Sequence, residues 1–157
     1  MSAAEASVFL ADEVTVEEKV DGANLGIAVD AAGQPVVWNR GTVLHPGSHP
    51  QFAPLWGWLA QRAVALGTAL GGSLALFGEW CVAVHSARYD RLPDWFLAFD
   101  VCDVERDEFW SSDRRDALAA RLGLATVPRV ARDRFSLPAL VERVRWTPTS
   151  QIGRAHV

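Results

Sequence analysis

The sequence is poor in cysteine, lacks any long apolar run and contains a single lysine. Its two cysteines, Cys81 and Cys102, cannot build a disulfide framework, and neither has a cysteine or histidine nearby at zinc-site spacing. No apolar stretch approaches the ~18 residues that cross a membrane, and the N-terminus lacks the basic start and apolar segment of a secretory signal. We therefore expect a cytoplasmic protein with reduced cysteines.

Several common catalytic and architectural patterns are also missing. The sequence has no glycine-rich phosphate-binding loop, no zinc-ligand spacing and no Ser-His-Asp order. It has no internal repeat, no low-complexity tract and no clear interdomain linker. These absences argue against a P-loop NTPase, a zinc enzyme, a triad hydrolase and a repeat protein. They also favour a single domain that spans residues 1–157.

The composition is that of a globular protein with a sizeable core. Half of the 157 residues are apolar, and seven are tryptophan and seven phenylalanine. The net charge of −4 is unevenly spread, because residues 1–105 carry five basic and thirteen acidic side chains, whereas residues 106–157 carry ten arginines and six acidic side chains. The arginine-rich part could contact phosphates, although a solvated helix surface is the simpler interpretation.

Lys19 is the only lysine, and the other fourteen basic side chains are all arginine. A lysine amine can lose its proton and attack an electrophile, whereas a guanidinium is effectively always charged. A sequence that otherwise uses arginine for positive charge therefore singles out Lys19 as a candidate covalent nucleophile. The alternative is a strand lysine whose ammonium group reaches out to solvent.

Sequence periodicity predicts a mixed fold of strands and helices. Strands are expected at residues 14–20, 25–29, 35–39, 73–81, 95–102 and 127–130. Helices are expected at residues 51–70, which Gly71-Gly72 end, at 113–122 between a Ser112 cap and Gly123, and from Ser136 onwards. Because short turns join several strands, we expect an α+β domain with antiparallel-rich sheets and packed helices.

Two of the strands expected to be buried each contain one acidic residue. Glu79 lies in the mostly apolar segment 73–81, and Asp100 lies in the second half of segment 95–102. An unpaired buried charge is costly, so each carboxylate needs a partner. A strand-end acid that faces solvent or forms a local salt bridge is the alternative for each.

Four short motifs occur in order along these strands. They are Lys19-Val20-Asp21-Gly22, Arg40-Gly41, Gly78-Glu79 and Phe99-Asp100. Their order resembles the covalent nucleotidyltransferase superfamily of ATP-dependent RNA ligases, DNA ligases and mRNA capping enzymes, and most closely the RNA ligase family. Lys19 to Gly22 matches the KxDG nucleophile motif of that family, and the resemblance covers residues 14–130.

The resemblance implies an adenylation domain of the nucleotidyltransferase (ATP-grasp-like ligase) type that uses ATP and Mg²⁺ to join RNA ends. In the family, the lysine amine attacks the α-phosphate of ATP, expels pyrophosphate and holds AMP through a phosphoramidate. By resemblance, Arg40 and Glu79 contact the nucleotide at its ribose, Phe99 stacks on adenine and Asn24 helps to hold the nucleotide. Asp21 would share a strand face with Lys19 if the strand persists.

Other roles in this part of the sequence stay open. Gly22 and Gly41 would let the backbone approach the ligand. Phe99 could also be an ordinary core aromatic. His85 follows the Glu79 strand and could contact the site, but a loop histidine that fixes its own backbone is the simpler interpretation. No set of metal ligands is predicted.

The sequence also departs from the family. The family has a later acidic motif of the type Glu-Gly-Val-Val and a later lysine-bearing strand, whereas here no lysine follows Lys19 and the last acidic residue is Glu142. We expect a partial, C-terminally incomplete adenylation domain. Because the cations that stabilise the leaving pyrophosphate are missing, we expect this chain alone to form the Lys19–AMP adduct very poorly or not at all.

Three functions remain compatible with the sequence. The first is an RNA ligase-like enzyme, and the second is a non-catalytic remnant of the fold that binds nucleotide or nucleic acid. The third is a DNA ligase or a capping-type guanylyltransferase. RNA and DNA substrates are not distinguished, since recognition of the 2′-hydroxyl leaves no simple local signature.

Overall fold

The computed structural model of the protein describes residues 2–85 and 88–145, which group into two compact units. The first unit draws on residues 1–19, 87–92 and 127–157, and the second on residues 20–86 and 93–126. The predicted α+β class with antiparallel-rich sheets and packed helices is confirmed. The assignment of residues 1–157 to one adenylation domain stays a prediction.

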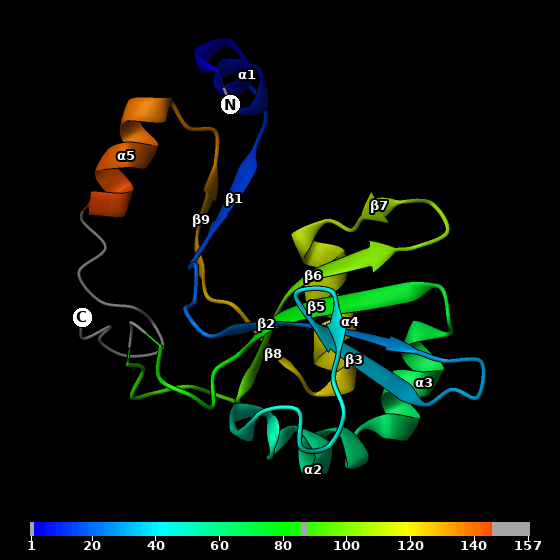
Figure 1. The fold of residues 1–157 in the computed structure, drawn as a ribbon. Coiled ribbons are helices and arrows are strands. Elements are labelled where there is room, and N and C mark those ends of the chain that lie inside the picture. The colour runs from blue at the N-terminus through cyan, green and yellow to red at the C-terminus, as the bar shows by residue number, and fades with distance from the viewer. Residues whose placement is uncertain (1, 86–87, 146–157) are drawn as a thin grey trace. The chain divides into compact units, whose positions relative to one another are not determined.

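A seven-stranded sheet forms the centre of the second unit (Figure 1). Its strands are β2 (Ala23–Val29), β3 (Pro35–Asn39), β4 (Thr42–Val43), β5 (Leu74–Trp80), β6 (Phe96–Asp103), β7 (Glu108–Phe109) and β8 (Ala125–Thr126). They follow the order β4-β3-β2-β5-β6-β7, all antiparallel, and β8 pairs in parallel with β6. The predicted strand at 35–39 is confirmed with its bounds, and those at 25–29, 73–81 and 95–102 differ by one or two residues at an end.

Helices cover one face of this sheet. Alternating residues of the strands point into a core with α2 (Leu55–Ala60), α3 (Ala63–Leu70) and α4 (Ser112–Leu122). The largest side chains that are almost fully buried include Leu25, Ile27, Trp80 and Phe96 from strands and Leu55, Leu66 and Leu118 from helices. The intervening residues point to the opposite side, which we call the helix-free face because α2, α3 and α4 do not pack on it; it includes Asn24, Gly26, Trp38, Phe77, Glu79 and Asp100.

The single helix expected over residues 51–70 is wrong. The segment forms a 3₁₀ turn at Pro50–Phe52 and then the two short helices α2 and α3, which meet at Gln61 and Arg62. The stop predicted at Gly71 is confirmed, since this residue adopts a left-handed conformation with φ of 56°. The helix expected at 113–122 is confirmed, but Ser111 rather than Ser112 caps it.

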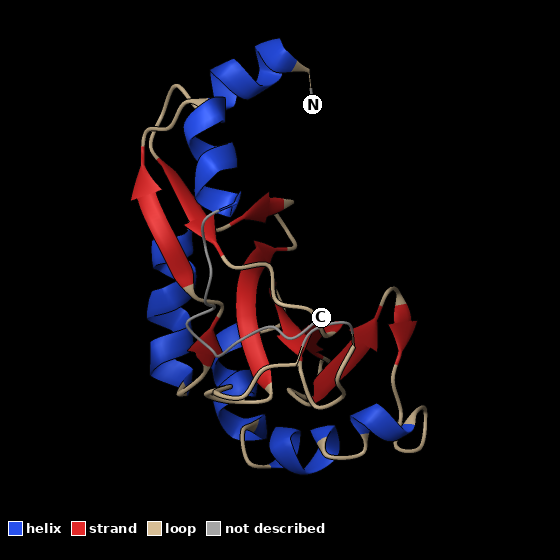
Figure 2. Cartoon of the chain, turned by 90° about the vertical axis from the view of Figure 1, so that its left-hand side faces the viewer, coloured by secondary structure: helices blue, strands red, loops and turns tan. Residues whose placement is uncertain are grey.

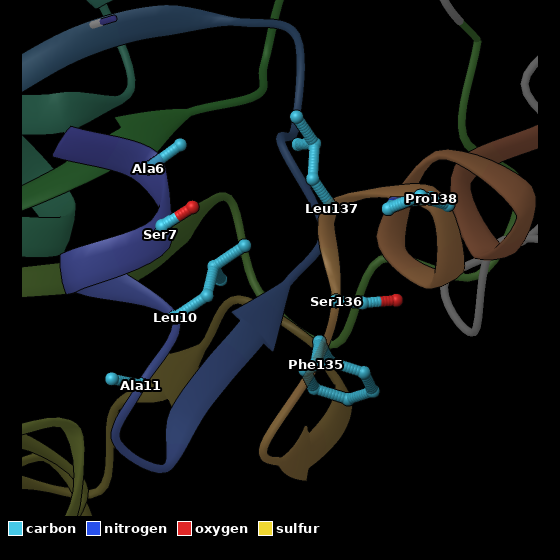
Figure 3. Close-up of a pocket in the computed structure, with 8 residues that line it drawn as sticks. All are labelled: Ala6, Ser7, Leu10, Ala11, Phe135, Ser136, Leu137 and Pro138. Carbon is cyan, nitrogen blue, oxygen red and sulfur yellow. The ribbon is translucent and has the colours of Figure 1, made fainter. Parts of the chain in front are cut away.

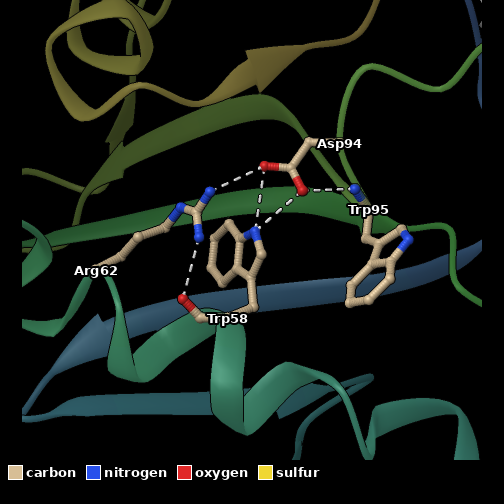
Figure 4. A network of polar contacts seen from close by, with 4 residues as sticks. All are labelled: Trp58, Arg62, Asp94 and Trp95. Carbon is tan, nitrogen blue, oxygen red and sulfur yellow. Dashed lines mark hydrogen bonds and ion pairs between the residues drawn. The ribbon is translucent and has the colours of Figure 1, made fainter.

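A polar network explains the break between α2 and α3 (Figure 4). Arg62 lies between the two helices with a φ of −119°, far from the usual helical value of about −63°. It forms an ion pair of 3.3 Å with Asp94 and also donates to the carbonyl oxygen of Trp58. The Trp58 indole donates to both oxygens of Asp94 at 3.1 and 3.2 Å. Asp94 also accepts from the backbone N–H of Trp95 at 2.6 Å. The polar network at the helix break thus connects α2 to the residues just before β6.

Among its described residues, the first unit contains a two-stranded antiparallel sheet and two helices. Strand β1 (Val14–Glu17) pairs with β9 (Arg129–Asp133), and the pair is visible in both views (Figures 1 and 2). The helices are α1 (Ala3–Phe9) and α5 (Leu137–Arg145). Among the described residues, no helix combines the length and the apolarity needed to cross a bilayer.

Two strand predictions in this unit need correction. The strand expected at 14–20 ends at Glu17, and that expected at 127–130 is shifted to 129–133. Helix α1 was not expected, although Ser2 and Glu5 form a capping box at its start. The helix predicted from Ser136 is confirmed, because the Ser136 hydroxyl accepts from the backbone N–H of Ala139.

Substitution of Asp94 is expected to destabilise the second unit. Asp94→Ala leaves the indole N–H of Trp58 and the guanidinium of Arg62 without their shared acceptor, and we expect the free energy of unfolding to fall by about 1–3 kcal/mol. Urea denaturation followed by tryptophan fluorescence measures this change. Asp90→Ala is the control, because the ion pair of 3.7 Å between Asp90 and Arg91 is exposed and is expected to contribute little. Equal losses in the two variants would contradict the network's role.

Candidate active site

The four predicted motifs can be located on the two units of the fold. Strands β2 and β5 are neighbours at the centre of the sheet, and their register places Asn24 directly opposite Glu79. Just before β2, the backbone N–H of Gly22 donates to Glu79 Oε1 at 2.9 Å. The end of the KxDG motif is thereby fixed to the acid that the sequence singled out on the next strand.

Gly22 approaches β5 so closely that a side chain does not fit. A Cβ atom at this position would lie 2.7 Å from the carbonyl oxygen of Trp80 and 3.1 Å from Cγ of Glu79. The glycine is therefore required by contact with the neighbouring strand, whether or not a ligand also comes near. At Gly41, by contrast, a Cβ atom would meet no other atom within 4 Å, and it is the positive φ of 83° that favours glycine.

Arg40 and Gly41 form the two-residue turn between β3 and β4, whose last pair is Asn39 with Thr42. Both turn residues have positive φ, 47° at Arg40 and 83° at Gly41, and such turns favour asparagine or glycine at the first position. An arginine there is conformationally costly, a pattern associated with functional sites. The Arg40 side chain is exposed, and Asn39 Nδ2 donates to the carbonyl oxygen of Asn24 at 2.5 Å.

A β-bulge presents the Phe99-Asp100 motif. Phe77 pairs with Asp100 and Gly78 with Ala98, so Phe99 is an extra residue in β6. Ala98 and Val101 belong to the core cluster, whereas Phe99 and Asp100 between them do not and are partly exposed. The irregular register thus keeps two consecutive side chains out of the core.

Lys19 is the last residue of the N-terminal segment of the first unit, residues 1–19, and is exposed. Strand β1 ends at Glu17, and the Glu18 N–H donates to the carbonyl oxygen of Pro128 at 2.9 Å. The shared face of Lys19 and Asp21 was expected only if the strand persisted, and this condition is not met because β1 ends before Lys19. Lys19 is joined to the second unit through Val20, and its placement against Glu79 and Arg40 stays a prediction.

Negative charge is concentrated where the KxDG motif meets β5. Burial, together with the charges of Glu79 and Asp21, raises the pKa of the Cys81 thiol to about 12. Both carboxylates are therefore close enough to Cys81 to act on it electrostatically. Such a concentration of negative charge favours a cation nearby, but within residues 2–85 and 88–145 no group of three or more histidine, cysteine or acidic residues could hold a metal ion.

A cavity of about 360 Å³ lies in the first unit, between α1 and the start of α5 (Figure 3). Its lining is mostly apolar and contains no charged side chain; it consists of Ala6, Ser7, Leu10, Ala11, Phe135, Ser136, Leu137 and Pro138. A triphosphate needs cations or several N–H donors, so this cavity does not suit ATP. His85 is exposed in the connection between β5 and β6 and is not part of the clusters above.

Arg115 is a residue near the site that was not predicted from the sequence. It is only 2% exposed, on α4, and its Nη1 donates to the carbonyl oxygen of Phe99 at 2.6 Å. The signal was its position on the helix, because Arg115, Leu118 and Ala119 follow the i, i+3, i+4 spacing of the buried face. A charged residue on an apolar stripe indicates a specific buried partner.

Comparison with known proteins agrees with this geometry. A sequence profile described as RNA ligase matches residues 12–148. The chain belongs to the RNA ligase family. The matched range contains all four motifs, from Lys19 to Asp100. No curated protein sequence matches the chain.

Solved structures show the same fold. An apo variant of Naegleria gruberi RNA ligase aligns with a TM-score of 0.69 and 14% identity over 97% of this chain and 46% of that chain. A variant of the same protein with ATP and Mn aligns with a TM-score of 0.61 and 16% identity, over 83% of this chain and 39% of that chain. An archaeal ATP-dependent RNA ligase aligns with a TM-score of 0.60 and 23% identity, over 81% of this chain and 34% of that chain. This chain spans less than half the length of each.

Introducing a methyl group at Gly22 should separate the motif from β5. In Gly22→Ala the new Cβ collides with the Trp80 carbonyl, and we expect a loss of about 1–3 kcal/mol in the free energy of unfolding, as for other overpacked sites. Chemical denaturation measures it. Gly57→Ala is the control, because a Cβ at Gly57 meets nothing within 4 Å. A Gly22→Ala protein as stable as the wild type would show that the approach is not tight.

The raised pKa of Cys81 predicts a loss of stability at high pH. In the unfolded chain the thiol ionises near its ordinary pKa of 9.0, whereas in the folded chain it stays neutral up to about 12. The unfolded state therefore binds fewer protons over that range, and the free energy of unfolding falls by up to ~1.4 kcal/mol per pH unit. Below pH 9 this contribution is fully present. Denaturation between about pH 8 and 11 should show a shallower decline for Cys81→Ala; equal slopes would contradict the assignment.

Proposed function

We propose that this chain carries the nucleotide-binding and nucleophile-bearing part of an ATP-dependent RNA ligase, in which Lys19 receives AMP before RNA ends are joined. The observation that carries the proposal is the hydrogen bond from Gly22 N–H to Glu79 Oε1, which fixes the Gly22 end of the KxDG motif to β5. The presence of ATP and Mn in a structure of similar fold supports the choice of nucleotide and of a divalent cation.

The described residues suit the recognition of a nucleotide on the helix-free face. Glu79 and Asn24 lie side by side on β5 and β2, and both can hydrogen-bond ribose hydroxyls or the base. Phe99 lies outside the core cluster and offers an aromatic ring for stacking on adenine. Arg40, exposed at the β3–β4 turn, supplies a positive charge for the nucleotide.

The proposed chemical step transfers AMP to the lysine. The Lys19 amine gives up a proton and forms an N–P bond to the α-phosphate of ATP, while the bond to the β-phosphate oxygen breaks and pyrophosphate leaves. A lysine amine is largely protonated at neutral pH, since its ordinary pKa is ~10.4. A divalent cation near the phosphates would assist both the deprotonation of Lys19 and the stabilisation of charge on phosphorus.

Mg²⁺ is the cation we propose. Because the described residues form no cluster of three metal ligands, a pre-formed protein cage does not fit this part of the chain. Mg²⁺ commonly binds through one or two carboxylates together with substrate phosphates, and Asp21 and Glu79 are carboxylates close enough to act on Cys81. The cytoplasmic location expected from the reduced cysteines belongs to the same proposal.

A second candidate is a nucleotide- or nucleic-acid-binding remnant without turnover. It is favoured by the single lysine of the sequence, since no other lysine is present to grip the leaving pyrophosphate. A DNA ligase or a capping-type guanylyltransferase would share the same covalent step and differ in substrate end or in base.

Transfer of label from ATP to Lys19 tests the proposal. The purified chain is incubated with α-³²P-labelled ATP and Mg²⁺, then denatured and digested, and the labelled peptide is identified by mass spectrometry. We expect acid-labile label on Lys19 in a small fraction of chains, none in Lys19→Arg, and none when GTP replaces ATP. Lys19→Arg keeps the positive charge and is the matched control.

The remaining outcomes separate the candidates. Label of equal amount in Lys19→Arg would show that Lys19 is not the nucleophile. ATP binding without any label on Lys19 would favour the binding remnant, and transfer from GTP alone would favour a capping-type enzyme. A chain that neither binds ATP nor takes up label would contradict the proposed function.

A further inference from the structure

A buried arginine lies behind the β-bulge of β6. Arg115, on the first half of α4, is 2% exposed and therefore almost fully withdrawn from solvent. Its Nη1 donates to the carbonyl oxygen of Phe99, the extra residue of the bulge, at 2.6 Å. Among the described residues that are buried, Arg115 is the one with a charged side chain, and the others are apolar.

The rest of the guanidinium is held by its neighbour on the helix. Arg115 Nε and Nη2 both donate to Asp116 Oδ1, at 2.9 and 2.7 Å. The carboxylate neutralises the charge and fixes the plane of the guanidinium, so that Nη1 points toward the strand. A lysine has a single point charge on a flexible stem and cannot make the two sets of contacts together.

The bulge needs such a partner. An extra residue interrupts the ladder between β5 and β6, and a backbone group left unpaired in a buried region costs free energy. The Arg115 guanidinium supplies a charge-assisted donor to the Phe99 carbonyl from the helix side. The same bulge keeps Phe99 and Asp100 out of the core, although Ala98 and Val101 on either side are part of it.

We propose that Arg115 is a positioning residue for nucleotide binding: through the Phe99 carbonyl it holds the β6 bulge in the register that presents Phe99 and Asp100 on the helix-free face. This inference rests on the proposed function for the part that concerns ATP. It does not require Arg115 to touch the nucleotide, because the guanidinium lies on the core side of the strand.

Three variants test the proposal. Arg115→Lys keeps a positive charge but not the fork of donors, Arg115→Ala removes the side chain, and Arg121→Lys is the matched control because Arg121 is exposed in the last turn of the same helix. Two quantities are measured on each folded protein: the amide ¹H–¹⁵N chemical shifts of residues 96–103, and the affinity for ATP with Mg²⁺ by calorimetry.

We expect both Arg115 variants to shift the amide resonances of Phe99 and Asp100 strongly, with small changes on β2 and β3. We expect the affinity for ATP to fall about tenfold or more. Without the charge-assisted hydrogen bond to the Phe99 carbonyl, part of the binding free energy would be spent on restoring the bulge. Low millimolar guanidinium chloride should partly restore the amide shifts and the affinity of Arg115→Ala. Urea at the same concentration, which carries no charge, should not.

Other outcomes overturn the proposal. Unchanged Phe99 and Asp100 resonances in Arg115→Lys would show that the guanidinium does not set the bulge. Shifted resonances with ATP affinity within twofold of the wild type would reduce Arg115 to a purely structural role. If Arg115→Ala does not fold, Arg115→Lys decides. If the wild type does not bind ATP, the proposed function fails, and the amide shifts still decide whether Arg115 sets the bulge.

Discussion

The pairing of β2 with β5 is the constraint on which the candidate site depends. It places Asn24 opposite Glu79 and brings the backbone before β2 so near to β5 that Gly22 donates to Glu79 Oε1 and has no room for a side chain. The pairing is secured on the other face by Leu25, Ile27 and Trp80, which are fully buried under the helices. Hydrophobic burial on one face of the sheet therefore fixes polar groups on the other.

The two faces of the sheet also explain why the site tolerates an irregular strand. A regular β6 would alternate strictly, and Phe99 and Asp100 would point to opposite sides. The bulge breaks that alternation, so both residues stay out of the core, while Phe96, Ala98 and Val101 still pack beneath it. The local loss of ladder pairing is offset by Arg115, whose buried charge would otherwise be difficult to explain.

The sequence was most informative where local chemistry decides structure. Strand β3, the left-handed stop at Gly71 and the α4 stop at Gly123 could be predicted because each depends on residues close in the chain. The motif residues could be selected for a similar reason, since their residue types and order are visible in the sequence. Their positions relative to Lys19 depend on tertiary placement, which periodicity does not contain.

The errors occurred where a distant residue overrides local preference. The pattern of residues 51–70 is that of one helix, but the chain breaks between α2 and α3 at Arg62, which pairs with Asp94, more than thirty positions away in the chain. Strand β1 ends at Glu17 although its residue pattern continues, because the pairing with β9 stops there. The bulge at Phe99 leaves no signature in either strand alone, because it is a property of their register.

The arginine-rich second part of the chain shows how little total charge says about a phosphate site. Arg106 pairs with Asp103, Arg115 with Asp116 and Arg132 with Glu13, and Arg114 stacks on the ring of Trp110 at 3.6 Å. At least four of the ten arginines of residues 106–157 therefore have partners inside the fold, and an excess of arginine alone does not indicate a phosphate site.

Arg40 is in none of these pairs. It occupies a left-handed turn position where a smaller residue would be less strained, on a hairpin whose base contacts the Asn24 strand. If one arginine of this chain contacts the nucleotide, its backbone strain and its exposure favour Arg40 over the ten arginines of residues 106–157. On the proposed function, Lys19 is consumed as the nucleophile, so stabilisation of the leaving pyrophosphate would fall to Arg40 and a divalent cation.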